Sequence, residues 1–244
     1  MKRPQVRTRV ARIHLVQPEV LSTYLAQLHR DRGVTLHLAT SIRSIALNEH
    51  GVSATLSTGE IVEANIVVEG LGLVPNDQLA VQAGIDCAGG IVTLPCGKTD
   101  REGIWAVGDV AVFDRPSALG VGRLESWANA NDLALLCARS IVRGTTEPYE
   151  TSAWFWSDQY IVNIQLCGSY PAEAEFAVRG DPTDTTEGTT WSALAMHNGA
   201  LVGAVVANDP QSAKAARRLL DRGFSDLEAL RDPNQTLMSI LKRS

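Results

Sequence analysis

Residues 99–109, which read TDREGIWAVGD, narrow the fold class of this chain. The apolar run at residues 103–107 predicts a buried strand, and Gly108 and Asp109 follow at its carboxyl end. In open α/β sheets, ligands bind in the loops beyond the carboxyl ends of the strands. Gly108 lets the backbone approach a ligand closely, and Asp109 offers an acceptor for a sugar hydroxyl. The pair therefore indicates either a ligand-binding turn or an aspartate that caps the next helix.

The composition is that of an ordinary globular protein. Hydrophobic residues make up 45% of the 244-residue chain and charged residues 20%, which is enough apolar material to build a core. The formal net charge of -5 gives nucleic-acid binding no electrostatic support. No apolar run reaches the roughly 18 residues of a membrane-spanning helix, and the basic stretch at residues 2–12 is typical of a frayed tail. We expect a cytoplasmic protein with neither nucleic-acid nor membrane partners.

The cysteines and histidines give no metal-binding pattern. Cys87, Cys96, Cys137 and Cys167 form no C-x-x-C pair, and the five histidines are scattered along the chain. The spacing therefore predicts no metal site and no adjacent redox dithiol. Free thiols, buried or half-buried in a reducing cytosol, are the expected state.

Hydrophobic periodicity predicts a mixed first part of the chain. Helices are expected at residues 19–30, 77–83 and 125–142, and a hairpin at residues 41–56 around the turn Asn48-Glu49-His50-Gly51. Compact apolar runs predict strands at residues 34–38, 64–68 and 103–107, of which the last two suit buried parallel strands. This alternation is typical of an α/β fold.

The pattern changes near Pro148. Between residues 154 and 206, strand-like segments alternate with turns, and residues 213–220 and 227–230 then predict helices. A separate α+β domain with an antiparallel sheet is expected there.

Residues 99–109 taken together point to one protein family more specifically than Gly108 and Asp109 do alone. It resembles T-x-x-x-x-(I/V)-(Y/F/W)-A-x-G-D, the second FAD-binding fingerprint of the two-dinucleotide flavoprotein reductases. The resemblance implies that Asp109 contacts the ribityl chain of FAD and that Gly108 and Val110 belong to the same cofactor-binding turn.

A second resemblance lies upstream of the first, in the order that the family requires. Residues 64–76, ANIVVEGLGLVPN, resemble the end of the NAD domain in these reductases, although Asn65 stands where the family often has Asp. The resemblance implies that Gly72 and Pro75 shape the loop beside the nicotinamide.

Two further segments point to one subfamily. Residues 123–130, RLESWANA, resemble the start of the helix that points at the flavin ring in bacterial oxygenase-type NADH:ferredoxin reductases. This resemblance implies that Glu125, Ser126 and Trp127 lie at the cofactor. Residues 154–160, WFWSDQY, resemble the element that opens the C-terminal domain of the same reductases, so Trp154 and Trp156 are expected to wall the flavin. Tryptophans that simply pack in a core strand are the alternative.

Together these segments resemble the C-terminal part of the putidaredoxin and rhodocoxin reductase type. The implied fold is α/β, an incomplete two-dinucleotide-binding (glutathione-reductase-like) flavoprotein fold followed by an α+β C-terminal domain. The implied domains are the end of an NAD-binding domain at residues 1–92, the second part of an FAD-binding domain at 93–147 and an interface domain at 148–244. The implied reaction passes electrons from NAD(P)H through FAD to a [2Fe–2S] ferredoxin that serves an oxygenase. No residue is predicted to be catalytic, because the cofactor carries the chemistry.

The sequence contains no G-x-G-x-x-G motif, whereas the family carries that motif once for each dinucleotide. A helix N-terminus with a close glycine backbone makes pyrophosphate binding favourable, so this chain alone is expected to bind FAD weakly or not at all. Open sheet edges and exposed apolar faces are also expected. A truncated frame, a fragment, and one half completed by another chain or by a homodimer remain alternatives.

Two other functions remain open. One is a disulfide reductase of the same fold, and the other is a cofactor-free interaction module that docks to partners. Lys214, Arg217, Arg218 and Arg222 lie on or near one predicted helix, where they would meet an acidic ferredoxin or form a solvated face.

Overall fold

The computed structural model describes residues 18–49, 51–114 and 121–244. The basic stretch at residues 2–12 and His50 of the predicted turn lie outside the described residues. The chain divides into two compact units, one of Met1–Leu73 with Pro182–Thr185 and one of Val74–Asp181 with Thr186–Ser244. The three-domain division of the sequence remains a prediction.

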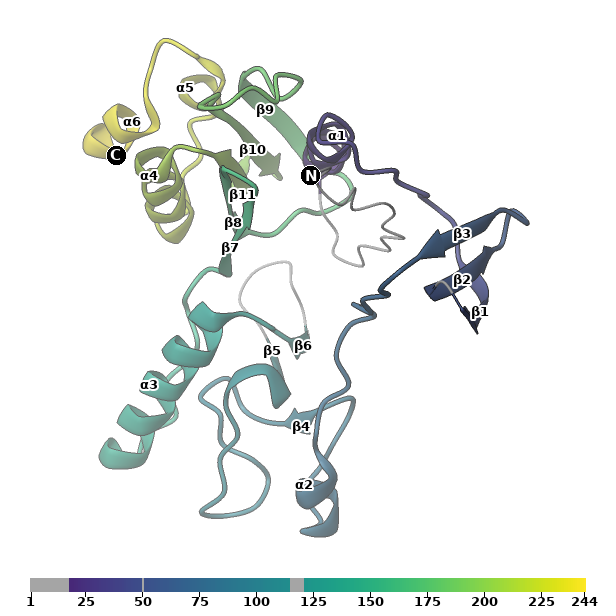
Figure 1. The fold of residues 1–244 in the computed structure, drawn as a ribbon. Coiled ribbons are helices and arrows are strands. Elements are labelled where there is room, and N and C mark those ends of the chain that lie inside the picture. The colour runs from purple at the N-terminus through teal and green to yellow at the C-terminus, as the bar shows by residue number, and fades with distance from the viewer. Residues whose placement is uncertain (1–17, 50, 115–120) are drawn as a thin grey trace. The chain divides into compact units, whose positions relative to one another are not determined.

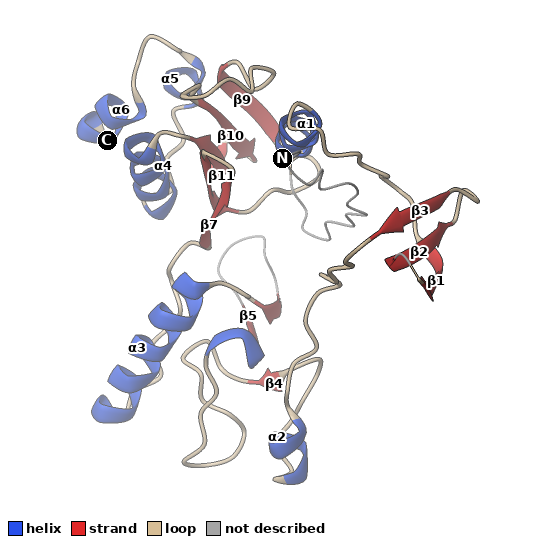
Figure 2. Cartoon of the chain, in the orientation of Figure 1, coloured by secondary structure: helices blue, strands red, loops and turns tan. Residues whose placement is uncertain are grey.

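Both helices and strands occur in the described chain, with the strands β7 to β11 in one run and the helices α4 to α6 after them (Figures 1 and 2). The helices are α1 (Glu19–Arg30), α2 (Gln78–Gln82), the 3-10 turn η1 (Gly108–Val110), α3 (Trp127–Arg143), α4 (Pro210–Asp221), α5 (Leu227–Arg231) and α6 (Leu237–Arg243). The strands are β1 (Ile42–Asn48), β2 (Gly51–Leu56), β3 (Ile61–Ala64), β4 (Ile91–Val92), β5 (Ala111–Asp114), β6 (Val121–Arg123), β7 (Trp154–Gln159), β8 (Val162–Gly168), β9 (Glu175–Gly180), β10 (Trp191–His197) and β11 (Ala200–Ala207).

The first unit contains α1 and an antiparallel sheet in the order β1-β2-β3. Helical spacing puts Leu21, Tyr24 and Leu28 on the buried side of α1, as the sequence predicts. The predicted hairpin is confirmed, because β1 pairs with β2 up to Asn48 opposite Gly51.

The second unit begins with α2 and a sheet in the order β4-β5-β6. β4 and β5 run parallel, whereas β5 and β6 run antiparallel. α3 follows, starting at the Ser126 cap and ending at Gly144, whose φ of 66° is the left-handed conformation that commonly ends a helix. The helix predicted at residues 125–142 is therefore confirmed within two residues at each end.

The C-terminal part is the predicted α+β unit. Its antiparallel sheet has the order β7-β8-β11-β10-β9, and the helices α4, α5 and α6 share a core with it. Side chains from the sheet (Leu194, Ala204) and from the helices (Leu219, Leu230, Ile240) meet in this core. Burial of these side chains stabilises the docking of the helices on the sheet.

Three predicted strands are wrong. Residues 34–38 contain a single bridge residue, Leu36, and residues 64–68 leave the sheet after β3. Residues 103–107 form an extended loop with one isolated bridge, between Lys98 and Trp105. Buried parallel strands need neighbours to cover both faces, and the described residues provide no parallel neighbour for these segments.

The predicted exposure of apolar residues is confirmed. In the segment after β3, Ile66 is 79% exposed, Val68 88% and Leu71 90%. A run of this kind normally lies inside a sheet, so these side chains leave a large apolar surface uncovered.

Arg179 on β9 holds the segment between α5 and α6 against the sheet. Its half-buried guanidinium donates hydrogen bonds to main-chain carbonyls of that segment, at 2.9 Å to Leu230, 3.2 Å to Ala229, 2.6 Å to Asp232 and 2.6 Å to Gln235. Burial lowers the pKa of Arg179, and the nearby Asp232 carboxylate opposes that shift. One side chain therefore satisfies several carbonyls that no helix bond uses.

We expect Arg179→Met to lower the free energy of unfolding by about 2–4 kcal/mol, because hydrogen bonds from a charged donor contribute roughly 1.5–3 kcal/mol each and the freed carbonyls regain part of this from water. Urea denaturation followed by far-ultraviolet circular dichroism measures the loss. Arg231→Met is the matched control, since Arg231 is 45% exposed and makes surface ion pairs worth less than about 1 kcal/mol. Equal losses in the two variants would contradict this role of Arg179.

Candidate functional site

The loop before Gly108 is held by the hydroxyl of Thr99. This buried hydroxyl lies 2.9 Å from the Ile104 carbonyl, to which it donates, and it accepts a hydrogen bond from the Arg101 amide at 3.2 Å. The loop is thereby closed on itself and leads directly into η1. The threonine of the fingerprint thus has a structural role here.

The turn η1 presents Asp109 to solvent. Gly108 is buried with a φ of 76°, a conformation that glycine adopts without strain, and it lies against Ala130 in the first turn of α3. The Asp109 side chain is exposed and forms no hydrogen bond or ion pair with any residue that the structure describes. A free carboxylate at this turn can accept hydrogen bonds from a ligand.

Arg123 fastens this turn to the segment before α3. Its Nη1 donates to the main-chain carbonyl of Asp109 at 3.3 Å, and its Nη2 lies 2.8 Å from Oε1 of Glu125. Gly90 makes room for this arrangement, since a Cβ at that position would lie 2.8 Å from Cδ of Arg123. Arg123 belongs to the helix-start motif of the sequence, but nothing in that motif predicts its contact with the Asp109 turn.

The N-terminus of α3 offers unpaired donors. The hydroxyl of Ser126 accepts a hydrogen bond from the Asn129 amide at 3.1 Å, and the Asn129 side chain donates to the Leu124 carbonyl at 2.7 Å. This cap leaves the amides of Trp127 and Ala128 without an acceptor inside the helix. The positive end of the helix dipole and two N–H donors, of which one belongs to the buried Ala128, therefore lie at the start of α3.

Three tryptophans from two elements form what we call the tryptophan wall: Trp127 on α3, and Trp154 and Trp156 on β7. The rings of Trp127 and Trp156 meet edge to face with centroids 5.8 Å apart, and those of Trp154 and Trp156 lie 5.0 Å apart at 31°. Trp127 is 67% exposed and Trp156 42%, so both keep large apolar faces open to solvent. Trp154 instead packs against the C-terminal core and donates to Gln165.

Arg217 and Asp132 are further residues at the wall whose role the sequence did not reveal. The guanidinium carbon of Arg217 lies 5.3 Å from the ring centroid of Trp154. One nitrogen of the same group lies 3.7 Å from a carboxylate oxygen of Asp132 on α3. No local motif predicts these contacts, because α4 is remote in sequence from both partners.

The predicted basic face of α4 is only partly present. Lys214 and Arg218 are exposed. The guanidinium of Arg222 donates to the Leu241 carbonyl at 3.2 Å, and that of Arg217 lies at the tryptophan wall. Two of the four cationic groups are thus engaged within the chain.

The predicted nicotinamide loop spans the boundary between the two compact units. Gly72, with a φ of 94°, belongs to the first unit, which ends at Leu73, whereas Pro75 belongs to the second unit, which begins at Val74. The proposed contact of both residues with a nicotinamide remains a prediction.

The cysteines do not form a reactive site. All four are free, and burial raises the pKa of Cys167 to about 12. Burial, with a smaller effect of Cys96, also raises the pKa of Cys137. Thiols with raised pKa values are poor nucleophiles at neutral pH.

Nowhere in residues 18–49, 51–114 and 121–244 do three or more His, Cys, Asp or Glu side chains gather to hold a metal ion. Within the same ranges, the helices are too short or too polar to cross a membrane.

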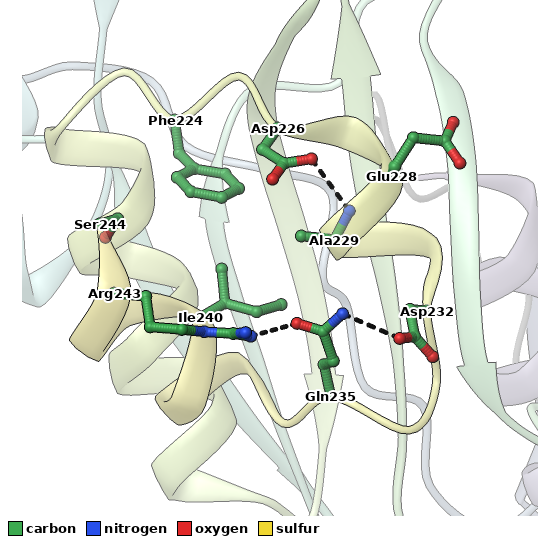
Figure 3. A pocket seen from close by; sticks show the side chains of 9 residues that line it. All are labelled: Phe224, Asp226, Glu228, Ala229, Asp232, Gln235, Ile240, Arg243 and Ser244. Atoms are coloured by element: carbon green, nitrogen blue, oxygen red, sulfur yellow. Dashed lines mark hydrogen bonds between the residues drawn. The ribbon is translucent and has the colours of Figure 1, made fainter.

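A hollow of about 560 Å³ lies between α5 and α6 (Figure 3). Its polar groups are paired with one another: Arg243 donates to Gln235, Gln235 donates to Asp232 at 2.8 Å, and Asp226 accepts from the Ala229 amide at 3.1 Å. None of the predicted site residues lines it. These bonds hold the C-terminal helices in place, so we do not consider the hollow a candidate site.

The residues around η1 and the start of α3 fit a specific kind of ligand. They offer a free carboxylate at Asp109, helix-terminal N–H donors at Trp127 and Ala128, and exposed indole faces. A sugar-alcohol chain joined to a flat heteroaromatic ring requires these three kinds of partner. The site residues predicted from residues 108–110, 125–127, 154 and 156 all belong to the same compact unit.

Several solved structures resemble this chain over nearly its whole length. The ferredoxin reductase for the CYP199A2 system from Rhodopseudomonas palustris is 29% identical with a TM-score of 0.83, and the match covers 93% of this chain and 55% of that one. Putidaredoxin reductase in its covalent complex with putidaredoxin is 26% identical with a TM-score of 0.86, over 97% of this chain and 57% of that one. This chain therefore spans little more than half the length of these relatives. An NAD-dependent persulfide reductase from A. fulgidus, at 17% identity and a TM-score of 0.76, shares the fold.

The family comparison divides the chain at nearly the place where the sequence changes character. Residues 154–241 match the family described as Reductase C-terminal. Residues 6–134 match the family described as Pyridine nucleotide-disulphide oxidoreductase. The predicted fold class and the resemblance to ferredoxin reductases of the putidaredoxin reductase type are both confirmed. Because the match at residues 6–134 covers more than half of this chain, the chain belongs to the pyridine nucleotide-disulphide oxidoreductase family.

Proposed function

We propose that this chain supplies the flavin-ring and ribityl half of the FAD site in an NAD(P)H:ferredoxin reductase. The observation that carries the proposal is the grouping of the unpaired Asp109 carboxylate, the capped N-terminus of α3 and the tryptophan wall in one compact unit. The similarity to two ferredoxin reductases supports the choice of electron acceptor.

Each group has a distinct task in this proposal. Asp109 accepts hydrogen bonds from ribityl hydroxyls, and Arg123 fixes the turn that carries it, through the 3.3 Å bond to the Asp109 carbonyl. The amides of Trp127 and Ala128 donate to the carbonyl oxygens of the flavin ring, where the helix dipole favours added electron density. Trp127 and Trp156 cover a ring face and keep water from it.

Bound FAD would accept a hydride from NAD(P)H and release electrons one at a time to a [2Fe–2S] ferredoxin that serves an oxygenase. The protein groups orient the cofactor and set its electrostatic environment, so no acid or base in the chain is required. We place this activity in the cytoplasm, since NAD(P)H is present there and the four free cysteines suit a reducing compartment.

The disulfide-reductase alternative gains no support from the thiols of this chain. Disulfide exchange requires an accessible thiolate, whereas Cys96, Cys137 and Cys167 are buried, and the pKa of the half-buried Cys87 thiol is raised, chiefly by desolvation. The cofactor-free interaction module is the outcome that a lack of flavin binding would favour.

The first test compares two ligands that share the ring and ribityl chain. Riboflavin and FAD are expected to bind the purified chain with dissociation constants within about threefold of each other, because the sequence has no glycine motif to hold the pyrophosphate. Quenching of flavin fluorescence on titration with the chain measures both constants. FAD binding at least about thirtyfold tighter than riboflavin would contradict the assignment of half a site. If neither flavin is quenched up to the solubility limit of riboflavin, the proposed function is wrong.

The second test concerns Asp109, the proposed hydrogen-bond acceptor for the ribityl hydroxyls. Asp109→Ala is expected to raise the dissociation constant for riboflavin about tenfold or more, since hydrogen bonds to a charged group contribute roughly 1.5–3 kcal/mol. Asp86→Ala is the matched control, because Asp86 is an exposed carboxylate in the same unit and outside the site. The same titration measures both variants, and a loss of affinity equal in the two would count against a ribityl contact at Asp109.

A further inference from the structure

We propose that Arg217 is a positioning residue for the tryptophan wall, holding α3 and β7 in the arrangement that presents Trp127 and Trp156 to a flavin. The inference rests on the proposed function for its link to a flavin. The effect on the indoles themselves is independent of any cofactor.

Two elements, β7 and α3, carry the tryptophan wall. Trp154 and Trp156 are two residues apart on β7 and therefore lie on the same face of that strand. Trp127 opens α3 and reaches Trp156 edge to face at 5.8 Å. Because Trp127 is 67% exposed, this single ring contact is open to water and holds α3 against β7 only weakly.

Arg217 contacts both elements from a third. Its guanidinium lies over the Trp154 ring of β7 at 5.3 Å and pairs with the Asp132 carboxylate of α3 at 3.7 Å. The planar guanidinium can stack on an indole and donate in its own plane to a carboxylate at the same time. One side chain of α4 thereby links the strand and the helix whose tryptophans meet.

The base of this link is rigid. α4 begins at Pro210 with Asp209 as its cap, and Ala213, Ala215, Ala216 and Leu219 are buried in the C-terminal core. Trp154 packs against the same core and donates from its indole nitrogen to Gln165 at 3.3 Å. Arg217 therefore extends from a fixed helix to a fixed ring, and Asp132 is the partner whose position it sets.

The energy of the link is modest, because the side chains of Arg217 and Asp132 are 31% and 39% exposed and water screens the ion pair. Loss of the link should loosen the wall without unfolding the protein. The consequence is a change in indole packing, followed by weaker binding of a ring that stacks on the wall.

The experiment uses the whole chain and the variants Arg217→Leu and Arg217→Lys. Near-ultraviolet circular dichroism reports the fixed packing of the indoles, and acrylamide quenching reports their exposure. Arg218→Leu is the matched control, since Arg218 is the next residue on α4 and its side chain is exposed. Far-ultraviolet circular dichroism checks that each variant is folded, and Trp127→Phe identifies the part of the signal that the wall contributes over Trp105 and Trp191.

We expect Arg217→Leu to lose most of the wall signal and to show increased quenching, with Arg218→Leu unchanged. Arg217→Lys should recover part of the signal, because it keeps the charge but not the planar group. The dissociation constant for riboflavin should rise about two- to fivefold in Arg217→Leu. If Arg217→Leu matches Arg218→Leu in both optical measurements, or if Arg217→Lys is no better than Arg217→Leu, the positioning role is overturned. If the optical change occurs but the unmodified chain binds no flavin, the role at the wall stands and the proposed function fails.

Discussion

The first turn of α3 packs against the Gly108–Val110 turn, and the placement of the other site groups follows from that contact. The left-handed φ of Gly108 lets η1 approach Ala130 closely. That approach places the Gly108–Val110 turn beside the first turn of α3, where the Ser126 cap leaves two amides without an acceptor inside the helix. Arg123 then fixes both segments through the Asp109 carbonyl and Glu125. The turn that carries Asp109 and the start of α3 are thus held together by short-range contacts.

Antiparallel and parallel strands differ in where their pairing partners lie along a chain, and this difference explains which predicted strands form here. Antiparallel strands pair with neighbours that are near in sequence, so the sheet from β7 to β11 forms entirely from its own segment. Parallel strands require neighbours from distant parts of a chain and cover on both faces. The apolar run around Val68 has neither among the described residues and remains exposed. Trp154 and Trp156 belong to the antiparallel sheet that completes its own pairing.

Sequence reasoning was most successful where the signal is local. Ser126 and Gly144 mark the ends of α3, and the turn at Asn48 and Gly51 fixes the first hairpin. Asp109 and Trp127 are candidates because their neighbours in the chain carry the pattern, and their contact with a flavin stays a prediction. Residues 64–68 were wrongly predicted as a strand, since an apolar run reports a preference and not the presence of a partner. Arg217 was assigned to a solvated or docking face, because its contacts depend on tertiary packing alone.

The central claim is that a flavin binds between η1, the start of α3 and the tryptophan wall. The most direct measurement is a nitrogen-15 NMR titration of the chain with riboflavin, followed through backbone amide and indole N–H signals. The account predicts the largest shifts at the amides of Asp109, Trp127 and Ala128 and at the indole of Trp156. Shifts centred on the hollow between α5 and α6, or no shifts at all, would contradict it.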